Sequence, residues 1–352
     1  MRRYILVLIA FLFYNFLFSG CETGQRKTSL EVFQDKIVFF CGDGICTVDP
    51  DGSDLKKVSS SKRKGAYLNS SWSSDKGMIG ATVFVRKMPQ ILLIASDGSR
   101  VDTLGLPVEK EEKVVVKKSV YFRGWVGEDG LLFSTGAFED ARAGVIDTTG
   151  EVKKILRGSY PKGLGQHKIA YLGYSYAKGG MGTDIMIFDL EAGKNLNLTG
   201  DKKIQYFLPT GSPDGEKIAF AFASRERAEE LWIINSEGKE RKLLATKEKD
   251  YEGMQMRTIE FSPDSKRLLF LPDNGAQSEV YVVNTDGTGL KGITGGIAHG
   301  RGGASWSPDG KRIVFTSLRD DNADIYIIAS DGTNLQRLTE HPGSEWAPLW
   351  VP

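Results

Sequence analysis

The chain has 352 residues, of which 40% are hydrophobic and 26% are charged, with 41 glycines and 12 prolines. This is ordinary globular composition, and the length suits two average domains or one large all-β domain. Lysine and arginine number 46 and aspartate and glutamate 45, so the net charge is +1. Because this balance offers no basic surface to bind phosphates, nucleic acid is excluded as a partner.

The first twenty residues have the pattern of a secretory signal peptide. Arg2 and Arg3 precede an apolar run over 4–18 that only Asn15 interrupts, and the small residues Ser19 and Gly20 follow it. The alternative is an uncleaved membrane anchor. The run is short for that role, since a membrane-spanning helix needs about 20 apolar residues.

Ser19, Gly20 and Cys21 resemble the lipobox of bacterial lipoproteins, although Phe18 stands where that family prefers leucine. The resemblance implies that Cys21 is acylated and becomes the first mature residue. We therefore expect a signal peptide over 1–20, a lipidated tether over 21–35, and an exported protein anchored in the cell envelope. It would face the periplasm or the cell surface, and the choice between inner and outer membrane stays open.

Cys41 and Cys46 come next and are separated by four residues. In an oxidising compartment such a pair predicts a disulfide. Closing so small a loop removes little chain entropy, so the bond would act as a local clip of a hairpin. A redox motif would need a Cys-x-x-Cys spacing, which is absent here.

Seven repeats occupy the chain from residue 36 onward. Each contains a strand rich in β-branched residues, a turn that ends in glycine, and a second strand. The turn glycines lie 46, 52, 43, 45, 49 and 45 residues apart, at Gly52, Gly98, Gly150, Gly193, Gly238, Gly287 and Gly332.

Another strand lies upstream of each of these, and a tight turn precedes most of those strands. The turn is clearest as Ser-Pro-Asp-Gly at 212–215 and 307–310, where proline sets the first corner and glycine relieves strain at the last. Large aromatic residues stand just before the turns, on what would be the innermost strand of each unit: Trp72, Trp125, Phe261 and Trp306. We expect Trp72, Trp306 and Trp346 to be core residues.

Four strands in each unit and a period in the forties predict the blades of a β-propeller. The first unit lacks its inner strand, and the segment over 346–352 has the pattern of such a strand with nothing after it. Pairing the two would close the ring and leave no exposed sheet edge. The predicted fold is an all-β, seven-bladed propeller over 36–352. Six blades is the alternative, because the unit around 163–166 is degenerate.

The segments 307–315 and 324–332 resemble the WD-like repeat of TolB-type propellers. The resemblance implies an exported propeller that often serves as a protein-binding platform. TolB itself carries an α/β domain before its propeller, and only the segment 22–34 stands there in this chain. The role of TolB itself is therefore not implied.

No cofactor, metal site or catalytic residue is predicted. The acidic turn with Asp49, Asp51 and Asp54 lacks the glycine and glutamate positions of an EF-hand loop, which leaves only weak calcium binding open. The three histidines, His167, His299 and His341, belong to three different repeats, which argues against a zinc site. A Gly-x-Ser-x-Gly elbow, needed for a hydrolase of the prolyl oligopeptidase type, does not occur.

Binding is expected on the face opposite the short turns, because variable loops on a rigid scaffold usually carry it. Tyrosine, methionine and arginine are enriched in interface cores. The candidate residues on these loops are Tyr174, Tyr176, Lys178, Tyr206, Phe207, Tyr251, Met254, Met256, Arg257, His299 and Arg301.

Together these features predict a monomeric, membrane-tethered envelope lipoprotein that binds a protein or peptide and is not an enzyme. The alternative is a carbohydrate-active or other envelope enzyme with a site in the central channel. A purely structural envelope component is a third hypothesis.

Overall fold

The structure is a computed structural model, and it describes residues 36–42, 44–60, 67–73, 77–85, 88–95, 101–104, 120–136, 141–177, 180–200, 205–224, 227–253, 255–320, 322–340 and 342–350. The predictions for the signal peptide, Cys21 and the tether lie outside these residues. Within them the only helix is the one-turn η3 (Gly275–Gln277), so none is long and apolar enough to cross a membrane.

The strands form seven antiparallel sheets of four, which confirms the prediction of seven blades. From the innermost strand outward, the first blade contains β28 (Glu345–Trp350), β1 (Ile37–Cys41), β2 (Gly44–Val48) and β3 (Lys56–Ser60). In the same inner-to-outer order, the second blade contains β4 (Tyr67–Trp72), β5 (Met78–Val85), β6 (Met88–Ala95) and β7 (Val101–Leu104), and the third contains β8 (Val120–Val126), β9 (Gly130–Thr135), β10 (Arg142–Ile146) and β11 (Val152–Arg157). The fourth contains β12 (Ser159–Leu164), β13 (Lys168–Ala177), β14 (Gly180–Asp189) and β15 (Lys194–Asn197), and the fifth contains β16 (Gln205–Gly211), β17 (Lys217–Ser224), β18 (Arg227–Asn235) and β19 (Lys242–Thr246). The sixth contains β20 (Met256–Phe261), β21 (Arg267–Pro272), β22 (Tyr281–Asn284) and β23 (Lys291–Gly292), and the seventh contains β24 (Ala304–Trp306), β25 (Arg312–Ser317), β26 (Asp324–Ala329) and β27 (Gln336–Arg337).

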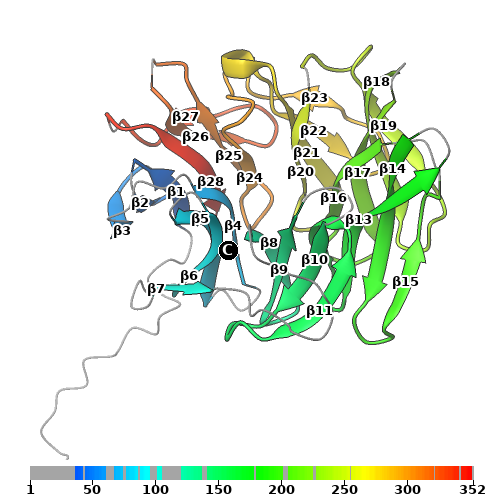
Figure 1. The fold of residues 1–352 in the computed structure, drawn as a ribbon. Coiled ribbons are helices and arrows are strands. Elements are labelled where there is room, and N and C mark those ends of the chain that lie inside the picture. Colours follow the sequence, from blue (N-terminus) through cyan, green and yellow to red (C-terminus); the bar gives the residue numbers. More distant parts are fainter. Residues whose placement is uncertain are drawn as a thin grey trace, which may run out of the picture.

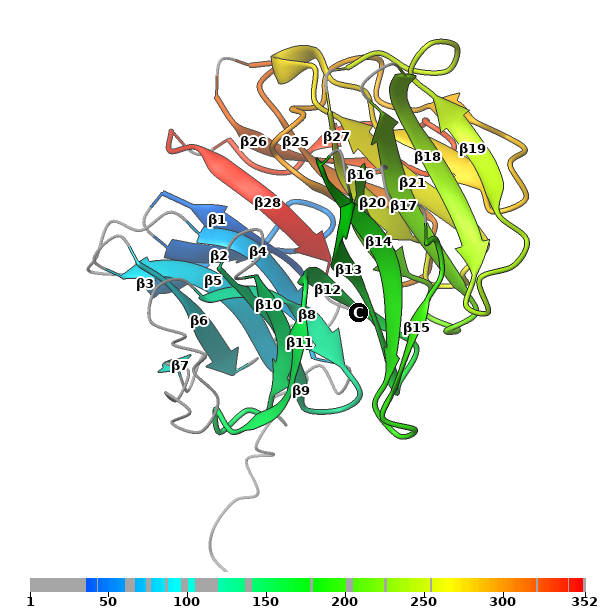
Figure 2. The ribbon, with the colours of Figure 1, turned by 45° about the vertical axis from the view of Figure 1, so that its right-hand side comes forward.

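The blades follow one another around a ring in chain order (Figures 1 and 2). Each innermost strand contacts the innermost strand of the next blade, including β28 with β4. The C-terminal strand β28 pairs antiparallel with β1, so the predicted closure by the C-terminal strand is confirmed. The degenerate unit around residue 163 is a complete blade, β12 to β15. Because the two ends of the chain share one sheet, opening the ring would require unpairing β28 from β1.

The short turns that recur in the sequence are built by one hydrogen-bond pattern. In the last blade the Ser307 hydroxyl donates to Asp309 Oδ1 at 2.6 Å and accepts the Arg312 backbone N–H at 2.9 Å. The equivalent Ser212 and Ser262 bind Asp214 and Asp264 in the same way. The serine hydroxyl therefore supplies the acceptor for a backbone N–H of the turn, which explains why Ser-x-Asp recurs in successive blades.

A second repeated polar contact lies at the opposite ends of the blades. Thr199, Thr294 and Thr339 follow the outermost strands of their blades, and their hydroxyls accept the backbone N–H groups of Ile185, Val280 and Ile325, respectively, at 2.9 to 3.0 Å. Each one ties the edge strand to its neighbour where the ladder ends.

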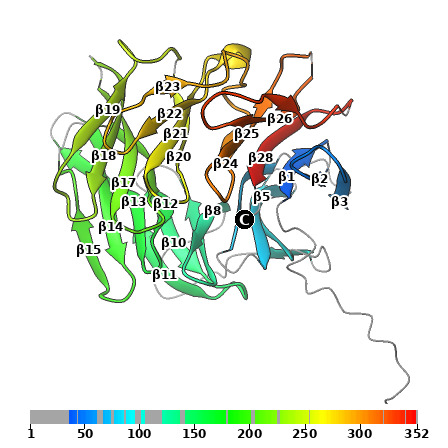
Figure 3. The same cartoon turned by 180° about the vertical axis from the view of Figure 1, so that it is seen from behind.

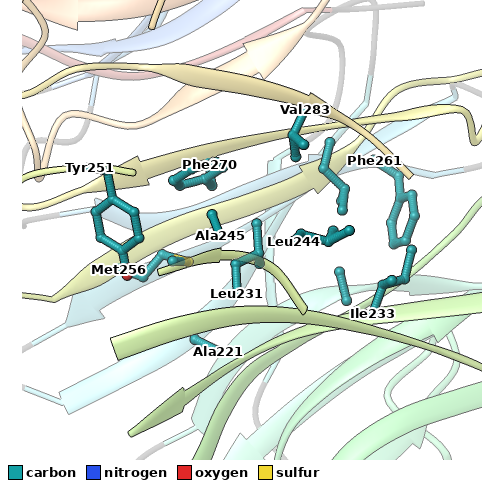
Figure 4. Packing of buried hydrophobic residues seen from close by; sticks show 12 residues of the cluster. Ala221, Leu231, Ile233, Leu244, Ala245, Tyr251, Met256, Phe261, Phe270 and Val283 are labelled. Carbon is teal, nitrogen blue, oxygen red and sulfur yellow. The ribbon is translucent and has the colours of Figure 1, made fainter. Parts of the chain in front are cut away.

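The core is made of apolar layers between adjacent blades. Figure 4 shows the layer formed by β17 to β22, in which Leu231, Ile233, Phe261 and Phe270 pack together. Tryptophans on inner strands also link blades, since Trp125 Nε1 donates to the Ser71 carbonyl at 3.0 Å and Trp306 Nε1 to the Glu260 carbonyl at 3.3 Å.

The predicted core tryptophans differ in their environments. Trp306 is buried, as expected. Trp346 is only half-buried, and its ring lies 5.0 Å from the ring of His299, so its placement in the core was wrong. It is the second residue of β28, close to the loop that carries His299. The side chain of Trp72 lies outside the description.

The antiparallel pairing places the described Ser-x-Asp and Asp-Gly turns on one face, called the turn face here. The other loops lie on the opposite face, called the loop face. Cys41 and Cys46 are buried at the loop-face end of β1 and β2 and form a disulfide, with their Cα atoms 5.8 Å apart. The bond closes the β1–β2 hairpin, the position in which the sequence predicts a local clip.

Candidate functional site

Six of the seven innermost strands carry a β-bulge against the second strand of their blade. In each case extra residues of the inner strand oppose one residue of the partner. The bulged residues are Asn69, Arg123, Tyr160 with Pro161, Leu208 with Pro209, Arg257, and Ala347 with Pro348. Bulges re-aim side chains and are frequent beside functional sites. The ring thus has an irregular inner surface, and Figure 3 shows several of these strands near its middle.

Arg123 is the bulged residue of β8 and is held by neutral partners. Its Nε donates to Ser134 Oγ at 2.7 Å, and its guanidinium lies 4.4 Å from the ring centre of Tyr160 and 5.3 Å from that of Tyr121. Tyr160 belongs to the next blade and has a positive φ of 50°. The bulge of β12 therefore brings an aromatic face over the guanidinium. Desolvation inside the ring lowers the pKa of Arg123.

Lys162 and Glu260 are two further charged residues on innermost strands, β12 and β20. Lys162 is an exposed residue of β12, yet the surrounding blades desolvate it, and together with Arg123 they lower its pKa to about 8. Burial raises the pKa of Glu260 on β20 to about 7, although the Trp306 N–H, the Ser305 hydroxyl and Lys162 all oppose that rise. β12 and β20 are the innermost strands of two blades that one whole blade separates, so both residues belong to the inner surface of the ring. We call Arg123, Tyr160, Lys162 and Glu260 the axial cluster.

A second polar group lies on the loop face. Asp273 follows β21 and is buried, with one carboxylate oxygen 3.1 Å from Arg257 Nε and 2.8 Å from Arg301 Nε. The side chains of Arg257 and Arg301 remain 40% and 66% exposed. His299 lies on the same loop as Arg301, and burial lowers its pKa, which favours the neutral imidazole. We call Arg257, Asp273, His299, Arg301 and Trp346 the arginine site.

Several residues predicted for the binding face are core residues instead. Tyr206, Tyr251 and Met256 are buried, and Phe207 is half-buried against two apolar clusters. Figure 4 shows Tyr251 and Met256 among the core side chains. The Tyr251 hydroxyl donates to the Glu229 carbonyl at 2.8 Å. These side chains lie at the ends of strands, where the neighbouring blade covers them, so their assignment to an exposed face was wrong.

The remaining predicted residues divide into three groups. Arg257, His299 and Arg301 come together in the arginine site. Tyr174 is half-buried on β13, and its hydroxyl is 2.9 Å from Ser159 Oγ beside the axial cluster. The side chain of Tyr176 and all of Lys178 and Met254 lie outside the description.

The acidic turn is occupied by lysines of the same blade. Lys36 Nζ lies 2.5 Å from Asp49 and 2.8 Å from Asp54, and Lys56 lies 2.6 Å from Asp54. In the part of the chain that the structure describes, no group of three histidine, cysteine or acidic side chains could hold a metal ion.

The sequence reasoning missed Asp273 and the whole axial cluster. One signal for the latter was present, because Tyr160, Leu208 and Ala347 each precede a proline within an inner strand. Proline inside a strand marks an edge or a bulge. Nothing comparable marks Arg123 or Lys162.

No family model and no curated protein matches this sequence. Solved structures do match. TolB from Acinetobacter baumannii has 16% identity and a TM-score of 0.56, over 90% of this chain and 67% of that one. An oligogalacturonate lyase in complex with manganese has 12% identity and a TM-score of 0.57, over 88% and 87%. The β-propeller domain of the Trilobed protease from Pyrococcus furiosus, described as having an open velcro topology, has 14% identity and a TM-score of 0.58, over 85% and 87%.

These likenesses show the fold: the chain is a seven-bladed propeller of the kind found in TolB and related proteins. Their names include TolB, a lyase and a domain of a protease. The function therefore has to be argued from the residues of this chain.

Proposed function

We propose that this protein is a membrane-tethered envelope lipoprotein whose loop face binds a protein or peptide. The observation that carries the proposal is the arginine site, where one buried carboxylate holds two exposed guanidiniums. Arginines held in this way lose little conformational freedom on binding, and arginine is among the residues enriched in interface hot spots.

The scaffold supports the same proposal. The ring is closed by β28, and the turns of the turn face are short and repeat one pattern. Apart from the repeated threonine contact, the described loops of the loop face share no single turn pattern, and one of them contains η3, the only helix of the described residues, next to Asp273. A rigid frame with irregular loops is the usual arrangement for recognition.

The test is a crosslinking capture in cells with the full chain. The variant Arg257→Ala/Arg301→Ala removes both guanidiniums, and Lys266→Ala/Lys311→Ala on the turn face is the matched control. We expect an envelope protein that the wild type and the control capture and the arginine variant loses. Equal capture by the arginine variant, with normal folding, would reject this site as the interface.

The tether is tested separately. Cys21→Ala should move the full chain from the membrane fraction to the soluble fraction and should abolish labelling by a fatty-acid probe. Retention of both in the variant would contradict acylation at Cys21.

A second candidate function is an envelope enzyme that acts at the axis. It rests on Glu260 and Lys162, whose pKa values of about 7 and about 8 suit proton transfer near neutral pH. Release of products from envelope polysaccharides by the wild type, lost in Glu260→Gln, would support it. No turnover by the wild type would count against it.

A further inference from the structure

Neither cation of the axial cluster has a carboxylate within ion-pair distance among the described residues. Arg123 and Lys162 make no ion pair within 4.0 Å in the part of the chain that is described. The groups that act most strongly on Arg123, besides desolvation, are the rings of Tyr160, Tyr121 and Tyr174. Arg123 and Lys162 also act on each other, because Arg123 lowers the pKa of Lys162.

Glu260 makes no direct ion pair with either cation. Its carboxyl is coupled to Lys162, but no ion pair of 4.0 Å or less joins them, and its oxygen Oε1 accepts from Ser305 at 3.2 Å and from the Trp306 N–H at 3.3 Å. Like charges inside a protein are costly unless an opposite charge joins them. Among the described residues, no side chain supplies such a charge within ion-pair distance of Arg123 or Lys162.

We propose that Arg123 and Lys162 form a binding site for an oxyanion, a carboxylate or phosphate group, on the axis of the propeller. The site shares no residue with the arginine site, so it goes beyond the proposed function and does not rest on it.

The geometry around Arg123 suits this ligand. Ser134 and the two tyrosine rings fix the guanidinium, which leaves a planar group already oriented inside the ring. A guanidinium carries five N–H donors and binds carboxylate or phosphate through two parallel hydrogen bonds. Lys162 adds a second charge from the neighbouring blade and is exposed, so a small ligand can reach it. Arg123 is the extra residue of the β8 bulge, and Lys162 directly follows the bulged Tyr160 and Pro161 of β12, where the Tyr160 ring lies 4.4 Å from the Arg123 guanidinium.

The test measures anion binding by the thermal unfolding of the full chain. Inorganic phosphate and acetate are each titrated at pH 7 against sodium chloride of equal ionic strength. Bound ligand stabilises the folded state by mass action, so the dependence of Tm on concentration gives Kd. Excluded salts such as phosphate raise Tm in every variant. The measure is therefore the difference between variants.

We expect Lys162→Gln to weaken the binding of the preferred anion at least tenfold, while Lys162→Arg and the turn-face control Lys311→Gln retain it. Arg123→Gln should abolish it. If Arg123→Gln does not fold, the comparison of Lys162→Gln with Lys162→Arg and Lys311→Gln tests the proposal by itself. Stronger binding of phosphate would assign a phosphate group as the ligand, and stronger binding of acetate a carboxylate.

The pH dependence provides an independent readout. Acetate keeps its charge between pH 7 and pH 9.5, whereas Lys162, with a pKa of about 8, loses its proton. Wild-type affinity for acetate should therefore fall several-fold over this range, and that of Lys162→Arg should not. The proposal is overturned if the wild type shows no anion-specific rise in Tm, or if Lys162→Gln and Lys311→Gln respond equally.

Discussion

Glu345 begins the closing strand β28 and has no exposed surface. One carboxylate oxygen accepts a hydrogen bond from the Thr339 hydroxyl, and the other, Oε1, is buried without a partner. Burial raises the pKa of Glu345 to about 7, and Asp324 adds to the rise while Thr339 and Arg337 oppose it. Because the carboxyl of an unfolded chain has a pKa near its usual value of 4.5, the folded state prefers the protonated acid.

The sign and size of the effect follow from this difference. The folded pKa lies above the unfolded one, so the stabilising contribution is complete below about pH 4.5 and is lost as the pH rises through 7. Each pH unit between the two values corresponds to about 1.4 kcal/mol, which gives about 3 kcal/mol in total. Glu345→Gln is neutral throughout and cannot lose this contribution.

The assay is urea unfolding of wild type and Glu345→Gln at pH 4.5 and pH 8. The free energy of unfolding of the variant, relative to wild type, should rise by about 3 kcal/mol between the two pH values. The change at a single pH also contains the cost of the new amide, so only the difference between pH values is diagnostic. Glu340→Gln, an exposed acid of the same loop, is the control. A relative stability of Glu345→Gln that does not change with pH would refute the reasoning.

Three further outcomes are expected. Gly80→Ala should lower the free energy of unfolding by about 1–3 kcal/mol in urea titrations, because the new Cβ would lie 2.4 Å from the buried ring of Phe122 in the next blade; an unchanged midpoint would contradict the tight packing. Replacing Cys41 and Cys46 by serine should cost about 2 kcal/mol, since the bond closes a loop with a sequence separation of only five, and the variant should lose the sensitivity to reductant that the wild type shows. Asp273→Ala should reduce capture of the loop-face partner as much as loss of both arginines, because the buried Asp273 carboxylate holds the two guanidiniums. Capture at the wild-type level would show that Arg257 and Arg301 do not need Asp273 to bind the partner.

The repeated pattern of strands and turns in the sequence was sufficient to predict the architecture. Ser307 and Asp309 determine their turn through hydrogen bonds to each other and to Arg312, all within five residues. Thr339 and its backbone partner Ile325 are only 14 residues apart. Contacts of such short range repeat with the blades, so they are visible as a period in the sequence.

The loop-face residues were predicted less well, because burial at a blade edge depends on the neighbouring blade. Tyr251 and Met256 follow an outer strand in the sequence, as loop residues do, but β18 and β21 enclose them. Arg257 is adjacent to Met256 and is the extra residue of the β20 bulge, and its side chain is exposed. A one-residue change of register of this kind leaves no trace in composition.

The sequence by itself determined the strands, the turns, the number of blades and the strand that closes the ring, because each depends on interactions within one repeat or on the pattern of one segment. Only the tertiary structure decided which polar side chains meet. Arg123, Lys162 and Glu260 come from three different blades, and ring closure arranges their innermost strands around one axis. Asp273 is joined to Arg301 only where two consecutive blades touch. Contacts between repeats depend on how the blades pack, and that packing is a property of the closed ring.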